Sequence, residues 1–201
     1  MADAVVHIID DDEAVRDSLS FLLDSVGLAA RIYDSAVAFL DQADRAAPGC
    51  IVTDVRMPDM SGLELVRRLA EQGIEHPVIV MTGHADVPLA VEAMKAGAVE
   101  FLEKPFEEET LLRAIRTALT KGGQAQEDRA EKQRLRAILD GLSPREREVL
   151  QGVIDGKLNK TIAFELGISA RTVEVYRANM MSKTGARGLS ELVQMVMLAR
   201  A

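Results

Sequence analysis

The chain has 201 residues, which is long for one small domain and suits two. A single cysteine, Cys50, excludes both a disulfide framework within the chain and a cysteine-based zinc site. The net charge of −8 is uneven: residues 1–120 hold 10 basic and 22 acidic residues (−12), and residues 121–201 hold 14 and 10 (+4). An acidic first part and a mildly basic second part indicate different partners for each.

No apolar run approaches the ~18 residues that a membrane span needs. The first residues lead directly into a strand-like segment without a basic leader, so no signal peptide is predicted. We therefore expect a cytoplasmic protein with no membrane partner. Cys50 is expected to be a small core residue at the start of a strand.

The first part of the chain alternates strand-like apolar runs with amphipathic segments. Strands are predicted at 5–9, 28–33, 50–53, 78–81 and around 101–102, and helices at 13–26, 35–42, 61–72, 86–96 and 107–120. Asp34 is the predicted N-cap of the second helix, and Gly27, Gly73 and Gly97 end others. This (βα)5 order predicts an α/β fold, a doubly wound, flavodoxin-like parallel sheet with helices on both faces.

Residues 121–140 are rich in charge and poor in apolar positions. Gly122-Gly123 is predicted to end the preceding helix. We interpret the segment as a linker, partly helical, between a first domain at 1–120 and a second at 141–201.

From residue 142 onward the pattern is only helical, with helices predicted at 144–155, 159–166, 170–183 and 190–199. Ser143 to Glu146 (SPRE) combines an N-cap serine, a proline at the first helical position and a capping-box glutamate. The tight turn at Gly167-Ile168 separates two short helices, as in a helix-turn-helix. The second domain is therefore expected to be all-α.

Chemically active side chains stand where the predicted strands end. Asp10 and Asp11 follow the first strand, Asp54 the third, Thr82 the fourth and Lys104 the fifth. Because the carboxyl ends of parallel strands share one edge of the sheet, these groups should meet. A carboxylate can accept a phosphoryl group as an acyl phosphate, and Asp54 is the predicted acceptor. Lys104 is predicted to pair with Asp54 or with phosphoryl oxygens, and Thr82 to hydrogen-bond the phosphoryl group.

Phosphoryl transfer depends mainly on charge neutralisation, which Mg²⁺ held by oxygen ligands supplies, and Mn²⁺ can substitute. Asp11 and Asp54 are the predicted direct ligands, with Asp10 beside them and the backbone carbonyl of Arg56 as a further ligand. Residues 10–13 taken alone also fit an acidic helix N-terminus, and Asp54 alone fits a turn residue. Five features in order at successive strand ends favour the phosphoryl site.

Several motifs resemble the receiver domain of two-component response regulators over about residues 4–120: IIDD at 8–11, TDVRMP at 53–58, SG at 61–62, MTG at 81–83 and KPF at 104–106. The resemblance implies phosphotransfer from a sensor histidine kinase to Asp54 and a cis peptide at Lys104-Pro105. It also implies a switch in which Thr82 moves toward the phosphoryl group and Phe101 turns inward. Many receivers carry Tyr at this last position, and Phe lacks the hydroxyl, so only the packing part of the switch carries over.

Three further segments resemble the LuxR-type DNA-binding domain, and within it the FixJ subgroup, over about residues 140–201: LSPREREVL at 142–150, NKTIA at 159–163 and ISARTVEVYR at 168–177. In such domains the second helix of the helix-turn-helix enters the major groove. Val173, Tyr176 and Met180 recur at helical spacing and are predicted to pack inward.

The remaining positions of this region are candidates for DNA contacts. Each charged residue taken singly also fits a solvated helix face. Some LuxR-type relatives carry Lys at positions 174 and 178, so their base preferences are not transferred. The candidates for base contacts are Arg171, Thr172, Glu174, Val175 and Ala178, and those for phosphate contacts are Lys160, Arg177 and Lys183.

Together these features predict a phosphorylation-dependent transcription regulator, not an enzyme, and an activator by resemblance. Its expected partners are a sensor histidine kinase, double-stranded DNA and RNA polymerase. The resemblance implies that phosphorylation promotes a homodimer through the helix at 86–96 and the fifth strand.

Two alternatives stay open. An aspartyl-phosphate phosphatase needs an acid two residues after the nucleophile, where Arg56 stands. A phosphate sink or protein-binding regulator would dock protein on its helical domain, and the salt dependence of DNA binding separates it from a DNA-binding protein.

Overall fold

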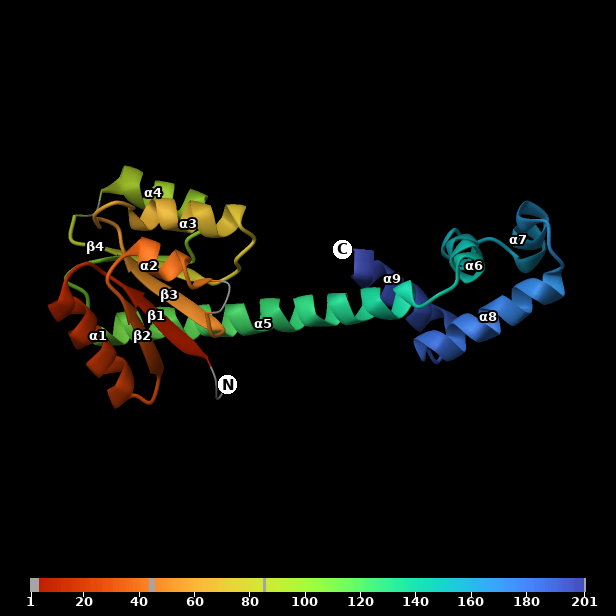
Figure 1. Cartoon of the computed structure of the whole chain (residues 1–201), viewed down its shortest axis with the longest axis horizontal. Helices are drawn as coiled ribbons and strands as arrows, with labels where there is room; N and C mark the ends of the chain where they lie inside the picture. Colours follow the sequence, from red (N-terminus) through yellow and green to blue (C-terminus); the bar gives the residue numbers. More distant parts are fainter. Residues whose placement is uncertain (1–3, 44–45, 85, 201) are drawn as a thin grey trace. The chain divides into compact units, whose positions relative to one another are not determined.

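The computed structural model describes residues 4–43, 46–84 and 86–200. The chain forms two compact units, Met1–Gln126 and Glu127–Ala201 (Figure 1). The division between them falls inside the predicted linker, and each unit has its own hydrophobic core.

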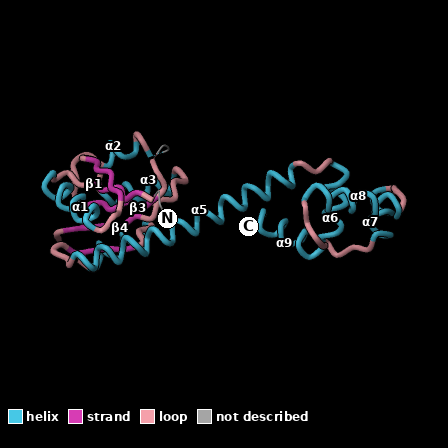
Figure 2. Tube along the Cα trace, turned by 90° about the horizontal axis from the view of Figure 1, so that it is seen from below, coloured by secondary structure: helices cyan, strands magenta, loops and turns pink. Residues whose placement is uncertain are grey.

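The first unit is built on a parallel sheet, whose strands are magenta in Figure 2. The strand order is β2-β1-β3-β4-β5. The predicted doubly wound (βα)5 fold is confirmed. Its strands are β1 (Val5–Ile9), β2 (Ala29–Tyr33), β3 (Gly49–Asp54), β4 (Val78–Thr82) and β5 (Glu100–Glu103). Its helices are α1 (Glu13–Ser25), α2 (Ala36–Leu40), α3 (Gly62–Glu71), α4 (Val87–Ala96) and the first part of α5 (Glu108–Asp140).

Helices cover both faces of this sheet and bury two separate apolar clusters. On one face α2, α3 and α4 pack over residues such as Ile9, Ile51 and Val80. On the other face α1 and α5 pack over Val52 and Met81, among others. Strands buried on both faces are continuous apolar runs, which is why the sequence pattern located them closely.

Two local predictions are wrong. Ser35, not Asp34, caps α2, because the Ser35 hydroxyl accepts a hydrogen bond from the Ala38 amide at 3.2 Å. The helix predicted to end at Gly122-Gly123 continues without interruption to Asp140.

The physical reason for the continuous helix lies at the two glycines. Neither has a positive φ, so the helical backbone passes through both. At Gly122 a Cβ atom would lie 3.0 Å from the Pro77 ring, so the missing side chain allows close packing. Each glycine costs about 1 kcal/mol relative to Ala, but the surrounding Lys, Gln, Ala, Glu and Arg residues favour helix.

The second unit is helical throughout its described part. The end of α5 packs with α6 (Pro144–Ile154), α7 (Asn159–Leu166), α8 (Ala170–Thr184) and α9 (Leu189–Arg200) around one core. The predicted inward face of α8 is confirmed: Val173 and Met180 are fully buried, and Tyr176 packs against the same core. In the described part of the chain, no helix is long and apolar enough to span a membrane.

The N-terminus of α6 has the predicted capping box. Ser143 Oγ accepts a hydrogen bond from the Glu146 amide at 3.3 Å, and Glu146 Oε2 accepts one from the Ser143 amide at 2.7 Å. Unlike most capping-box glutamates on a protein surface, Glu146 is buried, with 3% of its surface exposed.

Candidate functional site

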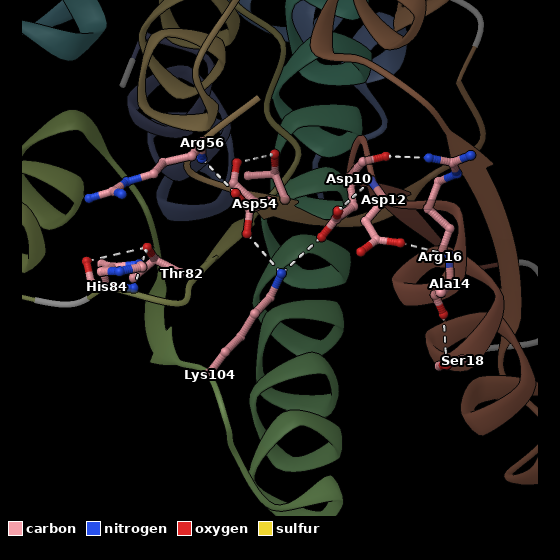
Figure 3. Close-up of polar contacts among 11 residues, drawn as sticks. Asp10, Asp12, Ala14, Arg16, Ser18, Asp54, Arg56, Thr82, His84 and Lys104 are labelled. Atoms are coloured by element: carbon pink, nitrogen blue, oxygen red, sulfur yellow. Dashed lines mark hydrogen bonds and ion pairs between the residues drawn. The ribbon is translucent and has the colours of Figure 1, made fainter. Parts of the chain in front are cut away.

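Three of the predicted site residues meet at the carboxyl edge of the sheet. Lys104, after β5, donates hydrogen bonds from Nζ to Asp54 Oδ1 at 2.8 Å and to Asp10 Oδ2 at 2.9 Å. Figure 3 shows its side chain reaching between the two carboxylates. Asp54 is the last residue of β3, and Asp10 directly follows β1. Asp10 and Asp54 are buried, at 2% and 8% exposure. Strand register explains the meeting, because Ile9 pairs with Thr53 and brings these two strand ends side by side.

Each carboxylate also accepts a backbone hydrogen bond on its other oxygen. Asp54 Oδ2 accepts from the Arg56 amide at 2.6 Å, and Asp10 Oδ1 accepts from the Asp12 amide at 3.0 Å. Amide and ammonium donors together fix the orientation of both carboxylates.

The Lys104 ammonium is stabilised in its charged form. Burial by itself lowers the pKa of Lys104, but hydrogen bonds and charge attraction from Asp54 and Asp10 outweigh burial, so its pKa is raised. A positive charge is therefore fixed beside the proposed acceptor oxygen near neutral pH.

Gly62 is required for the backbone behind Asp54. Its amide donates to the Val55 carbonyl at 3.0 Å, and a Cβ at this position would lie 2.1 Å from the Asp54 carbonyl oxygen. Ser61 caps α3 by accepting from the Glu64 amide at 3.2 Å. The Ser61-Gly62 pair thus starts α3 directly against the end of β3.

Thr82, at the end of β4, is buried on the same sheet edge, but its hydroxyl is bonded elsewhere. Its Oγ1 accepts from the His84 amide at 3.3 Å and lies 3.4 Å from the His84 carbonyl. Among the described residues, this hydroxyl makes no hydrogen bond to Asp54 or Lys104, although the Thr82 carbonyl accepts one from the Lys104 amide at 2.7 Å. Phe101, on β5, is half-buried and packs against the core beneath α4. The Lys104-Pro105 peptide is cis, as the resemblance implied.

Asp11 differs from the other two acids in its exposure. It is exposed, whereas Asp10 before it is buried. Among the described residues, no group of three His, Cys, Asp or Glu side chains is arranged to hold a metal ion. The four-member ligand set of Asp10, Asp11, Asp54 and the Arg56 carbonyl stays a prediction.

Two residues that were not predicted from the sequence support Asp10. Arg16 donates from Nη1 to the Asp10 carbonyl at 2.7 Å, and Asp12 caps α1 by accepting from the Ala14 amide at 2.9 Å (Figure 3). A signal was present for Arg16: a cation near a helix N-terminus opposes the helix dipole, which indicates a specific acceptor.

In the second unit, the predicted base-contact face of α8 is open. Arg171, Glu174, Val175 and Ala178 are exposed, while Thr172 is half-buried and its hydroxyl lies 2.8 Å from that of Ser169. The three residues predicted to contact phosphate differ in their surroundings. Lys160 on α7 is exposed, whereas Arg177 and Lys183 are bonded to residues of other helices.

A doubly wound domain with a lysine-bridged aspartate pair, followed by a helix-turn-helix domain, defines a DNA-binding response regulator. Residues 6–116 match the family described as "Response regulator receiver domain", and residues 140–196 match "Bacterial regulatory proteins, luxR family".

Similarity to known proteins extends over nearly the whole chain. It is 57% identical over 196 residues to the transcriptional regulatory protein FixJ of Azorhizobium caulinodans, covering 96% of this chain and 92% of that protein. Among solved structures, the response regulator StyR superposes with a TM-score of 0.87 at 43% identity, covering 98% and 99% of the two chains. Full-length FixJ from B. japonicum has a TM-score of 0.61 at 50% identity, covering 100% and 98%.

The chain therefore belongs to the FixJ-type response regulators. It is a phosphorylation-dependent transcription regulator with a receiver domain and a LuxR-type DNA-binding domain, and not an enzyme.

Proposed function

We propose that Asp54 is the phosphorylated residue, that a sensor histidine kinase is the phosphodonor, and that the phosphorylated chain activates transcription as a homodimer on double-stranded DNA. One observation carries the assignment: the Lys104 ammonium is bonded to both Asp54 and Asp10. Asp54 Oδ1 thus lies beside a fixed positive charge, as an oxygen that takes up a phosphoryl group requires.

The donor chemistry of the site fits a hard divalent cation. Two carboxylates with a backbone carbonyl nearby are oxygen ligands of the kind that Mg²⁺ binds, and Mn²⁺ accepts the same set. The proposed ligands are Asp10, Asp11, Asp54 and the Arg56 carbonyl. When bound, the cation neutralises charge on the transferred phosphoryl group.

The chain's own residues supply the other steps. Lys104 has its ammonium at Asp54 Oδ1 and is proposed to hold a phosphoryl oxygen after transfer. Among the described residues, the Thr82 hydroxyl is bonded only to the His84 backbone, so this hydroxyl is proposed to turn to the phosphoryl group. Phe101 is proposed to move further into the core as Thr82 shifts, which changes the surface of β5 and α4.

The surface of α4 supports the proposed homodimer. Val87, Val91 and Met94 are exposed at 77%, 46% and 50%, and their spacing puts them on one side of the helix. A dimer through this surface would bring two α8 helices to two half-sites on DNA. RNA polymerase is the proposed further partner of the activated dimer, and the cytoplasm is its proposed compartment.

Phosphorylation by a small phosphodonor such as acetyl phosphate tests the acceptor. With Mg²⁺ present, the full chain is expected to gain the mass of one phosphoryl group by intact-protein mass spectrometry, and Asp54→Asn to gain none. The matched control is Asp59→Asn, which changes an exposed acid of the same loop and suits its left-handed φ of 64°. Uptake by Asp54→Asn equal to that of the control would identify another acceptor.

A further inference from the structure

The helix-turn-helix pair carries four cationic side chains: Lys160 on α7, and Arg171, Arg177 and Lys183 on α8. All four are the kind of residue that binds DNA phosphates. They differ in what they already contact. Within the described part of the chain, Lys160 and Arg171 make no ion pair and no side-chain hydrogen bond, whereas Arg177 and Lys183 each have a partner on a neighbouring helix.

Lys183 forms an ion pair with a buried carboxylate. Its Nζ lies 2.7 Å from Glu146 Oε2, and only 4% of the Glu146 side chain is exposed. The same carboxylate holds the capping box of α6 through the Ser143 amide. The hydrogen bond from Lys183, followed by that from the Ser143 backbone, lowers the pKa of Glu146. Moving the ammonium to a DNA phosphate would leave a buried negative charge unpaired, which is strongly unfavourable.

Arg177 is held in the middle of α8. Its Nη1 donates to Asn159 Oδ1, the first residue of α7, at 2.6 Å. The residue also lines a cavity of about 110 Å³ with Val153, Met180 and Leu192, which are apolar residues of α6, α8 and α9. Arg177 is half-buried, in contrast to the exposed Arg171 six residues earlier.

We propose that Arg177 and Lys183 are positioning residues, which fix α8 against α7 and α6, and that Lys160 and Arg171 bind the DNA phosphates. This inference rests on the DNA-binding function of the second unit and revises the roles expected for Arg171, Arg177 and Lys183. The hydrogen bond of Arg177 at the middle of α8 and the ion pair of Lys183 near its end prevent the helix from rotating or sliding. Lys160 and Arg171 lie in the first turns of α7 and α8, where helix N-termini favour phosphate groups.

The salt dependence of DNA binding separates the two roles. Each phosphate contact contributes about 0.9 to the slope of log K against log salt concentration. Lys160→Met and Arg171→Met should each reduce that slope by about 0.9 per bound protomer. Lys183→Met should weaken binding about tenfold at every salt concentration and leave the slope unchanged, because it lowers the fraction of correctly placed helices.

The measurement uses fluorescence anisotropy of a labelled, mixed-sequence duplex with the full phosphorylated chain. Circular dichroism confirms that each variant is folded at the assay temperature. A slope reduced by Lys183→Met or Arg177→Met as much as by Lys160→Met would overturn the assignment.

Glu146→Gln gives a second readout in which the two roles predict opposite signs. Gln keeps the capping hydrogen bond of α6 but removes the charge that holds Lys183. A positioning role predicts weaker DNA binding. If Lys183 instead bound phosphate, removing a nearby negative charge would strengthen binding, and that result would refute its positioning role.

A double-mutant cycle tests Arg177 independently. If Arg177 acts through Asn159, the combined Arg177→Met and Asn159→Ala variant should lose no more affinity than the weaker-binding single variant. If the two losses multiply instead, Arg177 acts without Asn159 and its positioning role is wrong.

Discussion

The ammonium of Lys104 lies 2.8 Å from the Asp54 carboxylate, although 50 positions separate the two residues in the chain. The same ammonium contacts Asp10 at 2.9 Å, so one cation balances two buried acids from the ends of two other strands. The sheet brings these groups together, and the cation is what makes burial of two neighbouring carboxylates tolerable. We therefore propose that Lys104 contributes both to the stability of the first unit and to its phosphorylation.

Removing this cation should affect stability as well as phosphorylation. Lys104→Met leaves two buried carboxylates without their shared donor, which is expected to lower the free energy of unfolding of the first unit by about 1–3 kcal/mol. Urea denaturation of the full chain, followed by circular dichroism, measures the change. Lys95→Met is the control, because Lys95 is exposed on α4 and has no partner in the described part of the chain. Equal stability of the two variants would contradict the proposed contribution of Lys104 to stability.

A buried histidine at the centre of β1 makes the first unit sensitive to acid. The His7 Nε2–H donates to the Ala47 carbonyl at 2.9 Å, and Nδ1 accepts from the Tyr33 hydroxyl at 3.3 Å, so the neutral ring uses both nitrogens. Burial lowers the pKa of His7, and nearby His76 and Arg31 lower it further. Burial also lowers the pKa of His76, whose ring centroid is 5.4 Å away.

The folded state thus binds these protons less readily than the unfolded state, where histidine titrates near pH 6.5. Stability is full above about pH 6.5 and falls as pH drops below it, by about 1.4 kcal/mol for each unit that a pKa is lowered. His7→Gln should flatten the dependence of the urea midpoint on pH in this acidic range. His84→Gln changes an exposed loop residue and should leave the dependence unchanged. An undiminished acid dependence in His7→Gln would assign it to other groups.

The sequence was informative where a one-dimensional pattern determines a three-dimensional position. Apolar runs end at Asp10, Asp54 and Thr82, and parallel topology alone requires those ends to share an edge. The pattern does not give the burial of each acid: Asp10 is buried at the site, whereas Asp11 is exposed.

Long-range pairing was the part that local patterns did not predict. Lys183 looks like a free cation on a helix face, and its partner Glu146 lies 37 positions earlier. Glu146 itself fits a surface capping box, so nothing local indicates that it is buried. At Gly122-Gly123 the local pattern predicted a feature that the structure lacks. Low helix propensity predicts a break, but packing against Pro77 and helix-favouring neighbours keep α5 continuous.

The two glycines of α5 provide a matched test of that helix. A Cβ at Gly123 meets nothing within 4 Å, so Gly123→Ala should stabilise the chain by about 0.5–1 kcal/mol through helix propensity. At Gly122 a Cβ would lie 3.0 Å and 3.1 Å from two ring carbons of Pro77, so Gly122→Ala should gain less or lose stability. Thermal unfolding of both variants compares the sites. A helix that breaks at these residues predicts instead that neither substitution stabilises the chain.

Cys50 is expected to report opening of the first unit. Its side chain is fully buried in β3, and burial raises the pKa of the Cys50 thiol to about 12. Near pH 8 the reactive thiolate is then only on the order of 10⁻⁴ of the folded population, and reagents cannot reach it. A thiol reagent such as Ellman's should modify the urea-unfolded chain quickly and the folded chain only at the rate at which the unit opens. Because Lys104→Met destabilises that unit, it should accelerate modification, whereas Lys95→Met should not. Rapid modification of the folded wild-type chain would show that the strand is open to solvent.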